Sequence, residues 1–290
     1  MNKCCAEFEQ KLSQDGFQSC ILKGQGLAAL YGNLSNLRQS GDIDTWAIGE
    51  PQKVIEWASK TGSMTYFDYH HADLSLYKET GIELHYHPTL SRNLLRNARL
   101  QSWFQYEGKK HISFKEELGF TVPDYIFNVV LTINHNFWHL LYEGVGLRQI
   151  LDLYFVLKSL EDYGSAMNQK REEVSRLINF FHLKRFASVN MWIMKEVFKL
   201  EDRYLICAPD KNAGRFLLDE ILQSGNFGKY DKRLDGGRYE SRAGLMVSWI
   251  KHNSRLIRYY PIDVLWTPFG VTRISLWRRW YNNLTRIKTF

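Results

Sequence analysis

The first 60 residues alternate between helix-like and strand-like spacing of their apolar positions. Phe8 and Leu12 lie one helical turn apart among polar residues, which is typical of an amphipathic helix. Short apolar runs that are bounded by glycine are typical of strands. In chain order, the pattern predicts a helix over 6–16, a strand over 18–22, a helix over 27–31, a polar loop over 32–40, a strand over 42–48 and a helix over 52–60.

Three more strands are expected before the pattern changes. The runs over 72–78 and 82–87 are separated by the turn sequence Thr80-Gly81, so they predict a hairpin. The run over 103–112 predicts a third strand. Helices and strands therefore alternate up to about residue 118.

From Pro123 onward the spacing of apolar residues is helical. A proline is favourable in the first turn of a helix, so Pro123 is expected to lie in one. Further on, Ile150, Leu153, Tyr154 and Leu157 form an i, i+3, i+4, i+7 stripe, which predicts an amphipathic helix that packs on a core.

These patterns predict an α+β fold with two domains, a sheet with helices over 1–120 and a mostly helical domain over 121–290. The charged, glycine-rich stretch 225–243 predicts a loop. The last fifty residues are basic and rich in Trp and Tyr. We expect these aromatic side chains to bury the interface between the two domains, although they could also stack on bases or lie on a membrane surface.

Composition and charge narrow the class of protein and its partners. Of the 290 residues, 44% are hydrophobic and 24% charged, which excludes a largely disordered chain. The net charge of +7 suits polyanionic partners such as nucleotide phosphates, RNA or an anionic membrane surface. The four cysteines show no CxxC spacing, which favours a cytoplasmic protein. No run approaches the roughly 20 apolar residues that span a membrane.

The sequence Gly41-Asp42-Ile43-Asp44 carries the sharpest chemical signal. Side chains alternate between the two faces of a strand, so Asp42 and Asp44 point the same way. Two carboxylates this close favour a cation, and hard oxygen ligands favour Mg²⁺ or Mn²⁺. Glu83 is the best candidate for a third acid, and it shares one face of its predicted strand with His85 and His87.

A glycine turn precedes the two aspartates and could hold phosphate groups. Gly24 and Gly26 lie between a predicted strand and a predicted helix, where the backbone could approach a phosphate closely. Lys23 adds a positive charge at this turn, and Arg38 could add another from the following loop.

Several of these residues carry a resemblance to a known family. They are Leu22-Lys23-Gly24, Leu27-Ala28, Tyr31, Arg38, Gly41-Asp42-Ile43-Asp44 and Glu83-Leu84-His85, followed by His135 and Gly146-Leu147-Arg148 through Asp152. With them the chain resembles the uncharacterised bacterial nucleotidyltransferase family, which belongs to the DNA polymerase beta-like nucleotidyltransferase superfamily. Two positions depart from the superfamily's usual pattern: Lys23-Gly24 replaces Gly-Ser, and the third acid is Glu83 rather than Asp.

The resemblance implies a fold, a reaction and a set of site residues. The fold would be a mixed sheet with antiparallel edges and helices, followed by a helical domain. The reaction would move a nucleoside monophosphate from an NTP donor to a hydroxyl acceptor (a sugar, an antibiotic, a tRNA or a protein) and release pyrophosphate. The expected metal ligands and catalytic residues are Asp42, Asp44 and Glu83, and the expected nucleotide contacts are Lys23, Gly24, Gly26, Arg38, His85 and His135.

Other interpretations of the same residues stay open from the sequence. The chain could be a nucleotide- or RNA-binding module with a degenerate site, or a phosphotransferase that acts on a small molecule. His85 and His87 could bind zinc as a His-x-His pair, whereas His70-His71 is expected to be polar surface. Either His135 or His139, one helical turn apart, could face the nucleotide.

Overall fold

The computed structural model describes residues 1–224, 231 and 242–285. The chain forms two compact units, and neither is continuous in sequence. The first contains Met1–Leu90, Asn97–Leu131 and the end of the chain from Gly270. The second contains Ser91–Arg96 and Thr132–Phe269. The loop expected over 225–243 lies mostly outside the described residues.

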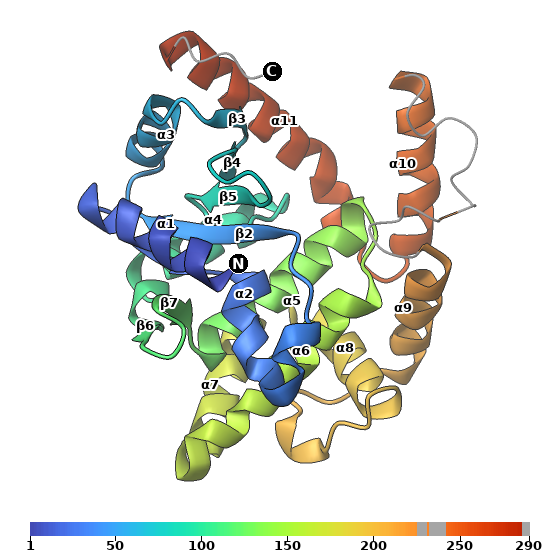
Figure 1. The fold of residues 1–290 in the computed structure, drawn as a ribbon. Helices are drawn as coiled ribbons and strands as arrows, with labels where there is room; N and C mark the ends of the chain where they lie inside the picture. The colour runs from blue at the N-terminus through green and yellow to red at the C-terminus, as the bar shows by residue number, and fades with distance from the viewer. Residues whose placement is uncertain (225–230, 232–241, 286–290) are drawn as a thin grey trace. The chain divides into compact units, whose positions relative to one another are not determined.

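A five-stranded mixed sheet forms the centre of the first unit (Figure 1). Its strands are β1 (Gln18–Ile21), β2 (Asp42–Ile48), β3 (Met64–Phe67), β4 (His71–Leu74) and β5 (Gly81–His85). The strand order is β1-β2-β5-β4-β3. Only the pair β2 and β5 is parallel in this sheet, and its other pairs are antiparallel. The predicted α+β fold with a mixed sheet is confirmed.

One face of the sheet packs on two helices, α1 (Asn2–Gln14) and α3 (Pro51–Lys60). Each helix presents apolar residues at helical spacing, as the sequence predicted. The residues that α1 and α3 bury in this core are Cys5, Phe8, Leu12, Val54, Ile55 and Ala58. Alternate residues of the strands, such as Ile43 and Leu84, complete the core.

The opposite face of β2 carries Asp42, Asp44 and Trp46. Trp46 packs against Phe104 and Phe127, with ring centroids 6.2 and 5.5 Å away. These rings come from α4 (Leu94–Tyr106) and α5 (Tyr125–Tyr142). The apolar contact therefore covers one end of this face, and the polar residues lie along the rest of it.

The strand predicted over 103–112 is wrong. Residues up to Tyr106 belong to α4, in which Leu100, Trp103 and Phe104 have the i, i+3, i+4 spacing of a buried helix face. A strand starts only at Ile112, where β6 (Ile112–Lys115) pairs with β7 (Phe120–Pro123).

Pro123 also differs from its prediction, because it ends β7 instead of beginning a helix. The following residue, Asp124, provides the helix signal. Its Oδ1 accepts a hydrogen bond from the backbone N–H of Phe127 at 3.0 Å, as a residue that caps a helix N-terminus does. The helix itself, α5, starts at Tyr125.

The predicted hairpin of β4 and β5 is confirmed, with shorter strands than expected. The sequence analysis missed β3, which pairs with β4 at the sheet edge. It also placed a loop over 32–40, although the short helix α2 (Lys23–Ala28) continues as a 3₁₀ helix over Ala29–Leu37.

The second unit is helical, as predicted. Its other helices are α6 (Leu147–Lys158), α7 (Met167–Phe180), α8 (Lys184–Glu196), α9 (Lys211–Ser224), α10 (Arg242–Leu256) and the first part of α11 (Pro261–Thr285), with 3₁₀ turns at Ser159–Ala166 and Asp202–Tyr204. Phe137 of α5, Phe186 of α8 and Tyr260, which directly precedes α11, pack together with ring centroids 4.8–6.2 Å apart. No described helix combines the length and the apolar character that crossing a membrane requires.

The end of α11 packs on the sheet of the first unit. Trp277 and Tyr281 contact Phe67 of β3 with ring centroids 6.2 and 5.5 Å away. Arg278 donates a 2.8 Å hydrogen bond to the Tyr66 hydroxyl. Trp277, Tyr281 and the sheet belong to the same unit, so these contacts lie within the first unit, and burial of a domain interface by the C-terminal aromatic residues stays a prediction.

Candidate functional site

Three carboxylates lie on the polar face of the parallel β2–β5 pair. Residues of β2 alternate between faces, so Asp42 and Asp44 share one. The register of the pair places Asp44 opposite Glu83. One carboxylate oxygen of Asp44, one of Glu83 and a ring nitrogen of His85 all lie within 4.8 Å of one another. The sequence had singled out all four residues.

His85 connects two of these carboxylates. Its Nε2 is 3.0 Å from Asp44 Oδ1 and 3.3 Å from Glu83 Oε2. The side chain is almost fully buried, at 1% exposure. A carboxylate only accepts hydrogen bonds, so the contact assigns a proton to Nε2 of His85.

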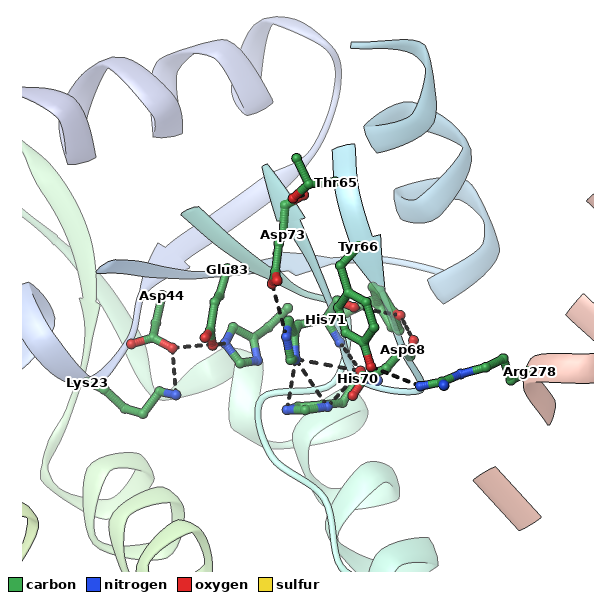
Figure 2. A network of polar contacts seen from close by, with 12 residues as sticks. Lys23, Asp44, Thr65, Tyr66, Asp68, His70, His71, Asp73, Glu83 and Arg278 are labelled. Carbon is green, nitrogen blue, oxygen red and sulfur yellow. Dashed lines mark hydrogen bonds and ion pairs between the residues drawn. The ribbon is translucent and has the colours of Figure 1, made fainter. Parts of the chain in front are cut away.

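Lys23 provides the positive charge nearest to the carboxylates. Its Nζ lies 2.5 Å from Asp44 Oδ1 (Figure 2). Burial opposes the charged form of Lys23, but Asp44 and Glu83 outweigh it and raise the pKa of the ammonium group. In this structure Lys23 therefore pairs with Asp44, and its contact with a phosphate stays a prediction.

Negative charge accumulates around Asp42. Burial, followed by the charges of Asp44 and Glu83, raises the pKa of Asp42 to about 6. Glu83 differs, because the hydrogen bond from His85 and the charge of Lys23 outweigh its burial and lower its pKa. A divalent cation would relieve the repulsion at Asp42, and oxygen ligands suit Mg²⁺ or Mn²⁺. The donor set therefore fits such an ion.

The glycine turn lies next to this cluster. A Cβ on Gly24 would meet Ser40 Oγ at 3.0 Å. Ser40 Oγ accepts a 3.0 Å hydrogen bond from Arg38, so Arg38 lies beside the same turn. A Cβ on Gly26 would come within 2.3 Å of the backbone oxygen of Ile21. Close packing against β1 therefore requires glycine at position 26. The sequence alone did not indicate this structural role.

The sequence analysis missed a group of residues beside the carboxylates. In the sheet, Asp73 pairs with Glu83 and Tyr66 pairs with Asp73, so a polar row crosses β3, β4, β5 and β2 (Figure 2). His71 pairs with His85 in the next row. The available signal was the alternation His-x-Asp in β4 opposite Glu-x-His in β5.

The expectation that His70 and His71 are polar surface is wrong. Their side chains are only 18% and 14% exposed. His70 Nδ1 lies 2.9 Å from Asp68 Oδ1, and His71 Nε2 lies 3.1 Å from Asp73 Oδ1. The turn between β3 and β4 is held against the end of β5, because the backbone N–H groups of Tyr86 and His87 donate to the His70 oxygen at 3.0 and 3.2 Å.

The side chains of the two other candidate histidines pack on residues outside this cluster. β5 ends at His85, so His87 leaves the strand and stacks on Tyr69 with ring centroids 5.1 Å apart. His135 lies in the second unit, where its Nε2 is 3.0 Å from Nε2 of His139. Its contact with a nucleotide stays a prediction.

Comparison with known proteins places the chain in a family. The model of the family described as "Uncharacterised nucleotidyltransferase" matches residues 3–199, which include every site residue named above. A search among curated proteins finds no match. The matched region covers more than half of the chain and contains both the carboxylate pair of β2 and the acid of β5. The chain therefore belongs to the family of uncharacterised nucleotidyltransferases.

Proposed function

We propose that this protein is a metal-dependent nucleotidyltransferase that moves a nucleoside monophosphate from an NTP to a hydroxyl acceptor and releases pyrophosphate. One observation carries the proposal: Asp44, Glu83 and His85 converge on the parallel β2–β5 pair, with Asp42 on the same face. Family membership supports the same reaction class.

In this proposal Asp42, Asp44 and Glu83 hold Mg²⁺ or Mn²⁺. Such an ion, when bound, neutralises the phosphate oxygens and activates the attacking hydroxyl. The raised pKa of Asp42, caused by burial and then by the charges of Asp44 and Glu83, supports the assignment.

The chain's other residues bind and orient the two substrates. Lys23 and the turn at Gly24 contact the triphosphate, with Arg38 beside the turn. The acceptor oxygen forms a bond to the α-phosphorus while the bond to the bridging oxygen of pyrophosphate breaks. Glu83 is the candidate to accept the hydroxyl proton. We assign catalysis to residues 1–120 and the choice of acceptor to residues 121–290.

Nucleotide binding provides the first test. We expect at least one of the four common NTPs to raise the melting temperature of the protein only when Mg²⁺ is present, because a ligand that binds the native state stabilises it. Asp44→Asn should abolish this shift. Glu50→Gln is the matched control, since Glu50 is an exposed acid two residues beyond the other end of β2.

Product analysis provides the second test. With an NTP labelled at the α-phosphate and a panel of sugars, antibiotics, tRNA and proteins, we expect label on an acceptor together with pyrophosphate. Release of NDP would instead indicate γ-phosphoryl transfer to a small molecule. Transfer that survives in both Asp42→Ala and Asp44→Ala would reject the proposed site.

A further inference from the structure

Three histidines form a second cluster beside the carboxylates. His70, His71 and His85 each offer a ring nitrogen, and these atoms lie within 4.8 Å of one another. His70 Nε2 is 3.0 Å from His71 Nδ1. Two nitrogen ligands of a tetrahedral zinc ion are about 3.4 Å apart, given bonds of about 2.0–2.1 Å, so the 3.0 Å between these two nitrogens is close to that separation.

Each of the three rings faces a carboxylate with one of its nitrogens. His70 Nδ1 contacts Asp68, His71 Nε2 contacts Asp73, and His85 Nε2 contacts Asp44 and Glu83. Histidines that bind metals through one nitrogen commonly donate the other N–H to a carboxylate, which sets the tautomer and the ring orientation. The ligand atoms would then be His70 Nε2, His71 Nδ1 and His85 Nδ1, of which His71 Nδ1 also lies 3.5 Å from Asp68 Oδ1.

The second nitrogen of His85 carries the argument further. Within the described residues, Nδ1 of His85 is buried and has no hydrogen-bond partner. A hydrogen bond between His70 and His71 would satisfy those two rings without a metal, but it leaves the lone pair of His85 Nδ1 unmatched. A bound ion at this position would give the buried nitrogen a partner.

We propose that His70, His71 and His85 bind a Zn²⁺ ion next to the proposed Mg²⁺ site. Imidazole nitrogens suit Zn²⁺, whereas oxygen ligands suit Mg²⁺, so the two clusters select different ions. Three protein ligands leave a fourth position open for water or substrate, as in catalytic zinc sites. Zinc on Nδ1 keeps the proton of His85 on Nε2, where it faces Asp44 and Glu83. The pair that the sequence suggested, His85 and His87, is replaced by this trio.

Cobalt binding tests the proposal directly. Untagged, chelator-treated protein is titrated with Co²⁺ in excess Mg²⁺ and without nucleotide, and Zn²⁺ is then added. We expect a strong visible absorption typical of tetrahedral Co²⁺, saturating at one equivalent and disappearing when Zn²⁺ displaces the cobalt. Three results would each overturn the site: no tetrahedral band, an octahedral spectrum alone, or a thiolate charge-transfer band, which would show that a cysteine binds the cobalt.

Variants locate the ion. His70→Gln and His71→Gln should each weaken Zn²⁺ binding by more than about 100-fold, and Asp68→Asn by about 10–100-fold, the range for a lost carboxylate partner. His182→Asn is the control, because it removes an exposed histidine and keeps a residue that tolerates its positive φ. Wild-type affinity in both His70→Gln and His71→Gln would reject the proposal. The measurement needs no nucleotide, so its failure is separate from failure of nucleotidyl transfer.

Discussion

Lys23 shows how one residue balances the charge of the candidate site. It has a φ of +38°, a backbone conformation that residues other than glycine rarely adopt. Its Nζ contacts Asp44 while Asp42 and Glu83 lie in the same charged cluster. Strained backbone of this kind is concentrated at functional sites, and Lys23 combines it with an ion pair to a carboxylate of the candidate site.

Lys23→Met should destabilise the protein and make it dependent on Mg²⁺. Removing one partner of a buried ion pair costs about 3–5 kcal/mol, because the remaining charge loses its compensation. A bound divalent cation replaces that compensation, so Mg²⁺ should raise the melting temperature of the variant more than that of the wild type. Urea and thermal unfolding with and without Mg²⁺ measure both effects.

Lys53→Met is the control for this prediction, because the side chain of Lys53 is 68% exposed and its ion pair with Glu50 is at the surface. If Mg²⁺ raises the melting temperature of the wild type, Lys23→Met and Lys53→Met equally, Lys23 and the metal do not share the carboxylates.

At the scale of single residues, the sequence predicted those features that depend only on neighbouring residues. Asp42 and Asp44 could be predicted to share a face, because alternation along a strand depends only on neighbouring residues. His70 and Asp68 could not be predicted, since their burial depends on how the turn after β3 folds over another strand. The same limit applies to Gly26, whose role depends on the backbone of Ile21.

Among the structural elements, the start of α4 is joined to other helices of the second unit by Arg96. This buried guanidinium forms an ion pair with Asp263 of α11. It also donates hydrogen bonds to the backbone oxygens of Phe181 and His182, at 2.9 and 3.1 Å. One side chain thus satisfies a helix C-terminus and a carboxylate at once.

Arg96→Met should lower the free energy of unfolding by about 3–5 kcal/mol, because Asp263 is left as an unpaired buried charge. The double variant Arg96→Met/Asp263→Leu should recover part of the loss, since an apolar pair carries no desolvation cost. Urea denaturation checks both values. Arg176→Met, at an exposed position of α7, should change stability little, and an equal loss there would contradict the explanation.

Element prediction failed where two residue patterns compete. Over 103–112 the aromatic residues favour a strand by composition. The buried residues Leu100, Trp103 and Phe104 nevertheless have helical spacing, and the packing of Phe104 on Trp46 of β2 selects the helix. The parallel pairing of β2 with β5 was not predicted, because pairing of distant strands has no local signal; the resemblance to a family implied only a mixed sheet.

At the scale of the whole molecule, a buried histidine makes stability depend on pH. Both ring nitrogens of His252 in α10 have a hydrogen-bond partner. Nε2 lies 2.8 Å from the backbone oxygen of Leu140, and Nδ1 lies 3.3 Å from Nη2 of Arg255. A carbonyl only accepts, so Nε2 carries the proton and Nδ1 accepts from Arg255. Burial, with the charge of Arg255, lowers the pKa of His252, although Glu220 and Asp231 oppose the shift.

Because its folded pKa lies below the unfolded value of about 6.5, His252 takes up a proton more readily in the unfolded chain. Stability should therefore be full above about pH 7.5 and fall as the pH drops through about 6.5 toward the folded pKa. His252→Gln, which can still donate to Leu140, should show a smaller loss between about pH 7.5 and 5.5 in urea denaturation.

His70 and His87, whose pKa values burial lowers to about 4, keep part of the pH dependence in this variant. The comparison is therefore the difference between wild type and variant. Identical pH profiles for the two proteins would show that His252 titrates alike in the folded and unfolded chains.

The sequence by itself determined the elements and the chemistry that depend on neighbouring residues: the helical second half, the β4–β5 hairpin, the carboxylates of β2 and the acid of β5. Only the tertiary structure decided which distant groups meet. It brought His70 and His71 to His85, and Arg278 of α11 to Tyr66, across 212 residues of chain. The physical reason is that periodicity is set by bonds between adjacent residues, whereas strand register and long-range contacts are set by packing of the whole fold.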